Sequence, residues 1–299
     1  MSRAAAKPAS AGMPADIEAK IRRIGPVIDP PATAAIYAPL HAKEPYTGVT
    51  VARDVRYGSD ARHALDVFAP QGASGSRPVF IFIHGGGYTG GHKREGDNFF
   101  YDNVMLWAAR HGMVGVNATY RLAPSHAWPA GAEDVGAAVR WTIDNIAKFG
   151  GDPKRIFLAG HSAGGTHVGT YVAISQFHTP GGPNLAGLIL LSGNYDLSGV
   201  PADERYAAYF GSDQSQYAAR SPLAGLLKTD VPLFAAYGEL EPPFLYQQSE
   251  NLIAALNKAG RAVQAVELPG HSHISITYSI NTGDTRLTDA MLEFIRRNE

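Results

Sequence analysis

The chain of 299 residues contains no cysteine, which excludes disulfide bonds, thiolate metal sites and a cysteine nucleophile. Charge of one sign is not in excess, since 26 basic residues are balanced by 27 acidic ones. This balance does not favour nucleic acid or an anionic membrane as a partner. No stretch reaches the ~18 apolar residues of a membrane span, and residues 1–14 lack the apolar core of a secretory signal. We therefore expect a cytoplasmic protein.

Apolar residues make up 45% of the chain and charged residues 18%, which is enough apolar material for a sizeable core. The length suits one large α/β domain, so we expect residues 1–299 to form a single domain. Residues 1–15 are small and alanine-rich and predict a disordered tail. Residues 16–46 and 193–230 are less regular, and we expect them to form cap elements over other parts of the molecule.

Strand and helix patterns alternate along most of the chain, which predicts a mostly parallel sheet with helices on both faces. The expected strands cover residues 49–57, 63–68, 79–83, 113–119, 155–159, 185–191, 231–237 and 262–268. The expected helices cover residues 16–24, 98–110, 131–149, 162–177, 244–259 and 285–297. After the first helix, prolines at positions 26, 30 and 31 predict an irregular segment that continues to residue 46.

A short apolar strand, a glycine-rich turn and a helix start follow one another around Ser162. The turn, Gly160-His161-Ser162-Ala163-Gly164, matches the pattern G-x-S-x-G. A serine at the apex of such a turn presents its hydroxyl group, and the flanking glycines let neighbouring backbone approach closely. The helix N-terminus adds partial positive charge where an oxyanion would form. We interpret Ser162 as a nucleophile, with a serine that merely caps the helix as the alternative.

The peptide His84-Gly85-Gly86-Gly87 follows another expected strand directly. Consecutive glycines leave backbone N–H groups unshielded, so these groups can point at a substrate oxygen. Together with Gly90, the glycines also fit G-x-G-x-x-G, the dinucleotide-binding fingerprint. That interpretation requires an acidic residue about 20 residues further on, whereas the next strand ends in Asn-Ala-Thr. We therefore favour oxyanion donors over a dinucleotide site.

Acyl transfer also needs a base and an acid, which follow the nucleophile in the order Ser, acid, His in this kind of arrangement. The loop after the last expected strand offers His271 and His273 as candidates for the base. The loop after the strand at 231–237 offers Glu239 and Glu241 for the acid. The two histidines could instead hold a metal, but no third ligand is evident, and we expect neither metal nor cofactor.

Several motifs together resemble the hormone-sensitive-lipase-like esterases of the α/β-hydrolase fold. They spread over about residues 60–275 of the chain. The matching blocks are HGGG at 84–87, GHSAGG at 160–165, GGDPKRI at 150–156, YRLAP at 120–124 followed by WPA at 128–130 and Asp134, and LDV at 65–67.

The resemblance implies an α/β-hydrolase fold with a small cap, and roles for particular residues. It places the oxyanion hole at the backbone N–H groups of Gly86, Gly87 and Ala163, and the base at His273 through the family pattern G-x-x-H. The family usually has Asp before the proline that follows the acid. Glu241 stands there in this chain, which is a departure, although either carboxylate can orient an imidazole.

Several side chains in loops near the serine are expected to bind the substrate, because such pockets are mostly apolar and aromatic. They are Tyr88, Trp128, His161, Tyr195 and Phe210. The modest length of the cap elements favours small or medium esters.

We therefore expect a serine carboxylesterase that hydrolyses short- to medium-chain esters through an acyl-enzyme with a Ser-His-Glu triad. An arylformamidase or other amidase would use the same catalytic residues, and a non-catalytic binding protein of the same fold is a third hypothesis. The expected partner is a small-molecule ester. The oligomeric state is left open, a homodimer included.

Overall fold

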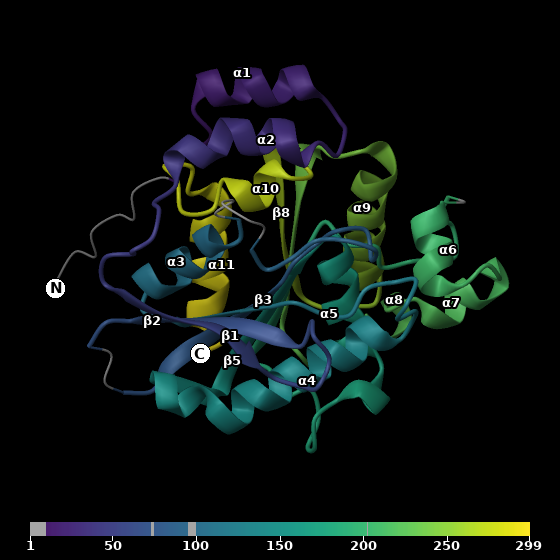
Figure 1. Cartoon of the computed structure of the whole chain (residues 1–299). Helices are drawn as coiled ribbons and strands as arrows, with labels where there is room; N and C mark the ends of the chain where they lie inside the picture. Colours follow the sequence, from purple (N-terminus) through teal and green to yellow (C-terminus); the bar gives the residue numbers. More distant parts are fainter. Residues whose placement is uncertain (1–9, 73–74, 95–99, 202) are drawn as a thin grey trace, which may run out of the picture.

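A computed structural model describes residues 10–72, 75–94, 100–201 and 203–299 of the chain (Figure 1). Within them, eight strands form one sheet in the order β1-β2-β4-β3-β5-β6-β7-β8. The strands are β1 Val49–Arg56, β2 Ala64–Pro70, β3 Arg77–Ile83, β4 Val114–Ala118, β5 Gly151–His161, β6 Gly187–Leu191, β7 Leu233–Leu240 and β8 Val263–Ser272.

The sheet is parallel except at one edge, where β2 pairs antiparallel with both β1 and β4. The central strands β3, β4 and β6 and the second half of β5 are mostly apolar, because side chains on both of their faces are covered. The expected strands are all present, with small differences at their ends, and the predicted α/β-hydrolase fold class is confirmed.

Helices cover both faces of the sheet (Figure 1). On one face, α3 and α11 pack through an apolar cluster that includes Trp107 and Phe294. On the other, α4, α5 and α9 share a cluster that includes Val139, Tyr171 and Leu256. The helices are α1 Ala15–Ile24, α2 Pro30–Tyr37, α3 Asp102–Arg110, α4 Ala130–Asn145, α5 Ala163–Ala173, α6 Glu204–Phe210, α7 Tyr217–Arg220, α8 Leu223–Leu226, α9 Pro243–Lys258, α10 Ser275–Tyr278 and α11 Arg286–Arg297, with short 3₁₀ turns at Ala38–Leu40, Ile146–Phe149, Ser175–Phe177 and Gln214–Gln216.

The N-terminal helices α1 and α2 lie beside β8 and α10 at the edge of the molecule (Figure 1). The expectation of an irregular segment over residues 26–46 was wrong in part, because Pro30 and Pro31 begin α2 rather than prevent it. Asp29 caps this helix by accepting a hydrogen bond from the backbone N–H of Ala32 at 2.9 Å. Proline is favoured in the first helical turn, where its missing N–H costs no helix bond.

The predicted tail over residues 1–15 falls mostly on residues 1–9, which lie outside the described residues. The single-domain organisation and the cap roles of residues 16–46 and 193–230 remain predictions. None of the helices in the described part of the chain combines the length and apolar character that a bilayer-spanning helix requires.

Candidate active site

Ser162 lies in the turn between β5 and α5 with φ 56° and ψ −123°, a left-handed conformation that non-glycine residues seldom adopt. Its side chain makes no capping hydrogen bond to α5, so the alternative interpretation as a helix cap has no support. The flanking glycines are required by close packing. A Cβ at Gly160 would stand 2.4 Å from the carbonyl oxygen of Gly164, and one at Gly164 would stand 2.2 Å from that of Ile83.

The glycine-rich loop after β3 lies directly against this turn. A Cβ at Gly85 would be 3.0 Å from the Cβ of Ser162. Gly86 and Gly87 have φ values of 131° and 60°, and the N–H of Gly90 donates to the carbonyl oxygen of Gly86 at 3.0 Å. Residues 88–94 form no helix, so the structure lacks the helix that a dinucleotide fingerprint begins.

His84 anchors the start of this loop. Its Nδ1–H donates to the carbonyl oxygen of Gly85 at 2.6 Å, and its ring stacks on Tyr120 with centroids 4.5 Å apart. The hydroxyl of Tyr120 donates to the carbonyl oxygen of His84 at 3.1 Å. Burial lowers the pKa of His84 to about 3, so the imidazole is neutral. We infer a structural role for His84.

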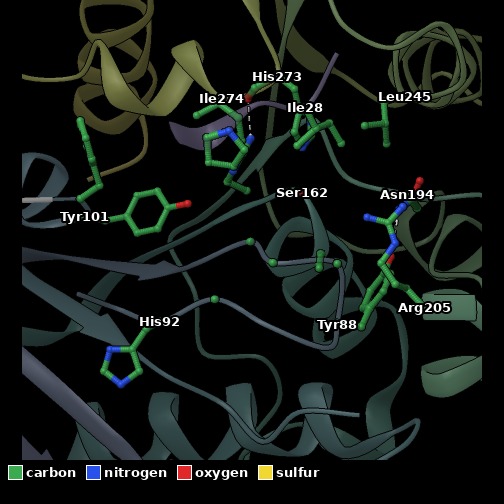
Figure 2. A pocket seen from close by; sticks show the side chains of 18 of the residues that line it. Ile28, Tyr88, His92, Tyr101, Ser162, Asn194, Arg205, Leu245, His273 and Ile274 are labelled. Carbon is green, nitrogen blue, oxygen red and sulfur yellow. Dashed lines mark hydrogen bonds between the residues drawn. The ribbon is translucent and has the colours of Figure 1, made fainter. Parts of the chain in front are cut away.

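Glu241 and His273 come together at the carboxyl ends of β7 and β8. The Nδ1–H of His273 donates to Oε2 of Glu241 at 2.7 Å, and both side chains are buried. The other carboxylate oxygen accepts hydrogen bonds from Ser192 Oγ at 2.5 Å and from the N–H of Gly238 at 3.5 Å. His273 and Ser162 line the same cavity (Figure 2).

The rival carboxylate, Glu239, points away from this pair. Its two oxygens bind the guanidinium of Arg22 on α1 at 2.9 and 3.0 Å, and one also accepts from the N–H of Gly270 at 2.7 Å. The Arg22 hydrogen bonds, followed by that of Gly270, lower the pKa of Glu239 below its usual value. Glu239 therefore links the N-terminal helix to the loop that carries His273.

The rival histidine, His271, has a carboxylate of its own. Its Nε2 lies 2.8 Å from Oδ2 of Asp284, and its Nδ1 lies 3.2 Å from Oγ of Ser275. All three side chains are buried, and they are not among the described residues that line the cavity. Among the described residues, no group of three or more histidine and acidic side chains is placed to hold a metal ion.

His161, the residue before the serine, supports the loop of His273. Its Nε2–H donates to the carbonyl oxygen of His273 at 2.8 Å, and the two rings lie 4.6 Å apart. Burial, and then the nearby His273, hold the pKa of His161 well below its usual range. The neutral ring therefore carries its proton on Nε2, while Nδ1 stands 3.3 Å from the position of a Cβ at Gly85.

A cavity of about 320 Å³ opens above Ser162 (Figure 2). Ser162, His273 and the expected oxyanion donors Gly86, Gly87 and Ala163 all contribute to its wall. Two of the expected substrate-binding residues, Tyr88 and His161, also line it.

Trp128, Tyr195 and Phe210 are not among the described residues that line this cavity, so a substrate-binding role for them stays a prediction. Tyr195 is buried, and its hydroxyl accepts from the N–H of Gly193 at 3.0 Å. Phe210 is fully buried among other aromatic rings, and Trp128 packs under the guanidinium of Arg220 at 5.2 Å. These contacts pack the three rings within or against the 193–230 segment.

Sequence reasoning missed several lining residues because they come from distant segments. Ile28 comes from the N-terminal section, Tyr101 and Tyr278 come from the start of α3 and the end of α10, and Arg205 and Tyr206 come from α6. None of these belongs to a motif around the serine. The one available signal was the concentration of Tyr in the irregular segment 193–230.

The comparisons with known proteins agree with this geometry. A family model described as alpha/beta hydrolase fold matches residues 80–277. Among curated proteins, Esterase LipQ and Esterase LipC of Mycobacterium tuberculosis are 29% identical over 263 residues and 28% identical over 242 residues. These matches cover 81% and 74% of this chain, but 61% and 59% of the relatives, so the chain spans less than two thirds of their length.

A solved structure of a bacterial heroin esterase is 24% identical, with a TM-score of 0.70, and the match covers 95% of this chain and 98% of that one. At this identity the likeness shows the fold. The family model covers more than half of the chain and agrees with the motifs around Ser162. The resemblance predicted from the sequence is thus confirmed, and the chain belongs to this alpha/beta-hydrolase family.

Proposed function

We propose that the protein is a serine carboxylesterase acting through Ser162, His273 and Glu241. The observation that carries the proposal is the meeting of three features at one cavity: a serine in a strained turn, a glycine-rich loop packed against it, and a buried histidine–carboxylate pair. The relatives LipQ and LipC are named esterases, which supports ester rather than amide hydrolysis.

In the first half of the reaction, Ser162 Oγ attacks the ester carbonyl carbon and its proton passes to Nε2 of His273. Glu241 holds the Nδ1–H of His273, so Nε2 is the unprotonated nitrogen that accepts this proton. The backbone N–H groups of Gly86, Gly87 and Ala163 stabilise the developing oxyanion. Collapse of the intermediate releases the alcohol with the proton from Nε2 and leaves the acyl group on Ser162.

In the second half, a water molecule gives a proton to Nε2 of His273 and attacks the acyl carbon. The second tetrahedral intermediate uses the same backbone donors, and the proton returns to Ser162 Oγ as the acid leaves. A cavity of about 320 Å³ fits short to medium acyl chains. Ile28, before α2, and Arg205, on α6, reach its wall, which is consistent with cap roles for both segments.

The decisive test is Ser162→Ala, assayed with a p-nitrophenyl ester series from acetate upward. We expect kcat to fall by more than about 10⁴-fold, because the nucleophile is removed while the fold is kept. Ser175→Ala, at an exposed serine just beyond the C-terminal end of α5, is the matched control. A fluorophosphonate probe should label the wild type and not the Ser162 variant. Turnover retained in Ser162→Ala would refute the proposal.

The preference for esters is tested separately, because an amidase would use the same residues. Matched ester and anilide substrates with one acyl group, together with N-formylkynurenine, compare the two bond types directly. We expect the ester to have the higher kcat/KM. A higher value for the amide or the formamide would retain the triad and assign an amidase instead.

A further inference from the structure

Arg205 brings a permanent positive charge to the cavity wall. Among the described residues that line the cavity, no other is an arginine or a lysine. It lies on α6, in the segment expected to form a cap. In Figure 2 its guanidinium group lies beside Asn194 and Tyr88, across the cavity from Tyr101. A charge this close to a reaction centre affects which substrates bind.

The guanidinium is oriented by an acidic neighbour on one edge. Asp203 accepts from Nε of Arg205 at 3.0 Å and from Nη2 at 2.9 Å. The Nη1 atom faces the glycine-rich loop, 3.4 Å from the position of a Cβ at Gly87. A guanidinium has five donors in a rigid fork, so one edge can hold Asp203 while Nη1 serves a second acceptor. Within the described residues Nη1 has no such acceptor.

The neighbouring polar side chains are engaged with one another. Asn194 donates from Nδ2 to the hydroxyl of Tyr88 at 2.9 Å, and its Oδ1 accepts from the hydroxyl of Tyr206 at 3.3 Å. The carboxylate of Asp203 does not line the cavity. An anionic group that enters the cavity therefore meets the donors of Arg205 and no opposing carboxylate among the described lining residues.

We propose that Arg205 selects esters that carry an anionic group, such as a carboxylate, within a few bonds of the scissile carbonyl. This inference rests on the esterase function proposed above and specifies its substrate class. The reacting carbonyl would sit at Ser162 and the glycine-rich loop, and the anionic group would accept a hydrogen bond from Nη1. A charge-assisted bond of this kind is stronger than a neutral one. The side chain is 56% exposed, so solvent screens the interaction and the expected preference is about tenfold.

The experiment compares two pairs of substrates that differ in charge. Monoethyl glutarate and ethyl pentanoate place the charge, or its neutral counterpart, on the acyl side. The alcohol side is represented by 4-acetoxybenzoate and its methyl ester. For each pair, the ratio of kcat/KM for the anionic substrate to kcat/KM for the neutral one is the measured quantity.

Arg205→Gln should lower this ratio about tenfold in at least one pair, and the affected pair identifies the side that carries the charge. Arg140→Gln, which removes the same charge from an exposed position on α4, is the matched control and should leave both ratios within twofold. In the wild type, raising the ionic strength from about 0.02 to 0.5 M should lower the ratio, since screening weakens the attraction.

Asp203→Asn provides a second, independent variant. It retains an oxygen that can cap α6 and releases the second edge of the guanidinium, so the ratio should rise several-fold. That rise should disappear in the double variant that also carries Arg205→Gln. If Arg205→Gln leaves both ratios unchanged while neutral esters are still hydrolysed, the inference fails and the esterase proposal stands. If the wild type hydrolyses no ester of either kind, the esterase proposal fails as well.

Discussion

Two histidine–carboxylate pairs stand two residues apart at the end of β8, and their hydrogen bonds are nearly the same. His273 Nδ1 lies 2.7 Å from Glu241, and His271 Nε2 lies 2.8 Å from Asp284. All four side chains are buried. Each pair even has a serine in its neighbourhood. The geometry of the histidine–carboxylate hydrogen bond therefore does not distinguish a reaction centre from a structural cross-link.

The surroundings of the two serines do distinguish them. Ser275, beside His271, is completely buried, and its hydroxyl accepts from the N–H of Ser272 at 2.8 Å and lies 3.2 Å from the carbonyl oxygen of Ser272. Ser162 instead lies at the cavity wall, in a strained turn packed against the glycine-rich loop. Access and backbone donors, rather than the histidine–carboxylate bond, separate the pair proposed for catalysis from the pair that ties β8 to the segment before α11.

The largest expected effect comes from replacing each histidine in turn by asparagine. His273→Asn removes the proposed base, so kcat for a p-nitrophenyl ester should fall by about 10³-fold or more, with KM little changed. His271→Asn should leave kcat within about threefold and lower the free energy of unfolding by about 2 kcal/mol, because it breaks a buried hydrogen bond. Urea denaturation and steady-state kinetics measure the two effects. The opposite pattern would assign the base to His271.

The second comparison replaces the carboxylates. Glu241→Gln keeps the shape of the side chain but removes the charge that stabilises the imidazolium of His273, so kcat should fall by about 10²- to 10⁴-fold. KM should stay within about threefold, because the carboxylate acts on the histidine and not on the bound substrate. A loss confined to kcat separates an effect on the base from simple loss of structure.

Glu239→Gln is the matched control, two residues away at the end of β7. Its partners are Arg22 and Gly270, so kcat should change by less than about threefold. A larger loss of kcat in Glu239→Gln than in Glu241→Gln would overturn the assignment of the acid.

The features that could be predicted from the sequence are those that depend on neighbouring residues. The turn at Ser162 and the glycine-rich loop need glycine at fixed spacings, since a Cβ at Gly160 or Gly164 would collide with backbone. The order of the eight strands and of the six longest predicted helices follows from apolar periodicity and was predicted, whereas the short helices α2, α6, α7, α8 and α10 were not.

The choice between the two candidate acids could not be predicted from the sequence. Glu239 and Glu241 differ by two positions, and β7 ends at Leu240 between them, so the strand alternation that would place both on one face no longer holds. No spacing rule tells which of them turns inward. Arg205 was out of reach for another reason, because its place depends on how α6 packs over the glycine-rich loop.

A smaller effect is expected at Ser192, which directly follows β6 and donates a hydrogen bond to Glu241. Ser192→Ala removes the hydrogen bond that Oε1 of Glu241 accepts and keeps the one that Oε2 accepts from His273. We therefore expect kcat to fall by about tenfold with KM unchanged. Restoring a hydroxyl with Ser192→Thr should recover part of the loss. A change in KM without a change in kcat would show that Ser192 does not act through Glu241.

The smallest effect is expected at Arg22 on α1, which pairs with Glu239 and so contacts the segments that carry Glu241 and His273. Both side chains are more than a third exposed, so Arg22→Gln should lower Tm by only about 1 °C, and added salt should reduce the difference. The pKa of Glu239 is lowered in the folded protein, so its stabilising contribution is present above the pKa of the unfolded chain and is lost as the pH falls. The difference in Tm should therefore narrow as the pH falls below about 5. If the difference in Tm between wild type and Arg22→Gln instead grows at acidic pH, Arg22 stabilises the loops through another group. A fall in kcat of more than about threefold would place this ion pair among the contacts that position His273.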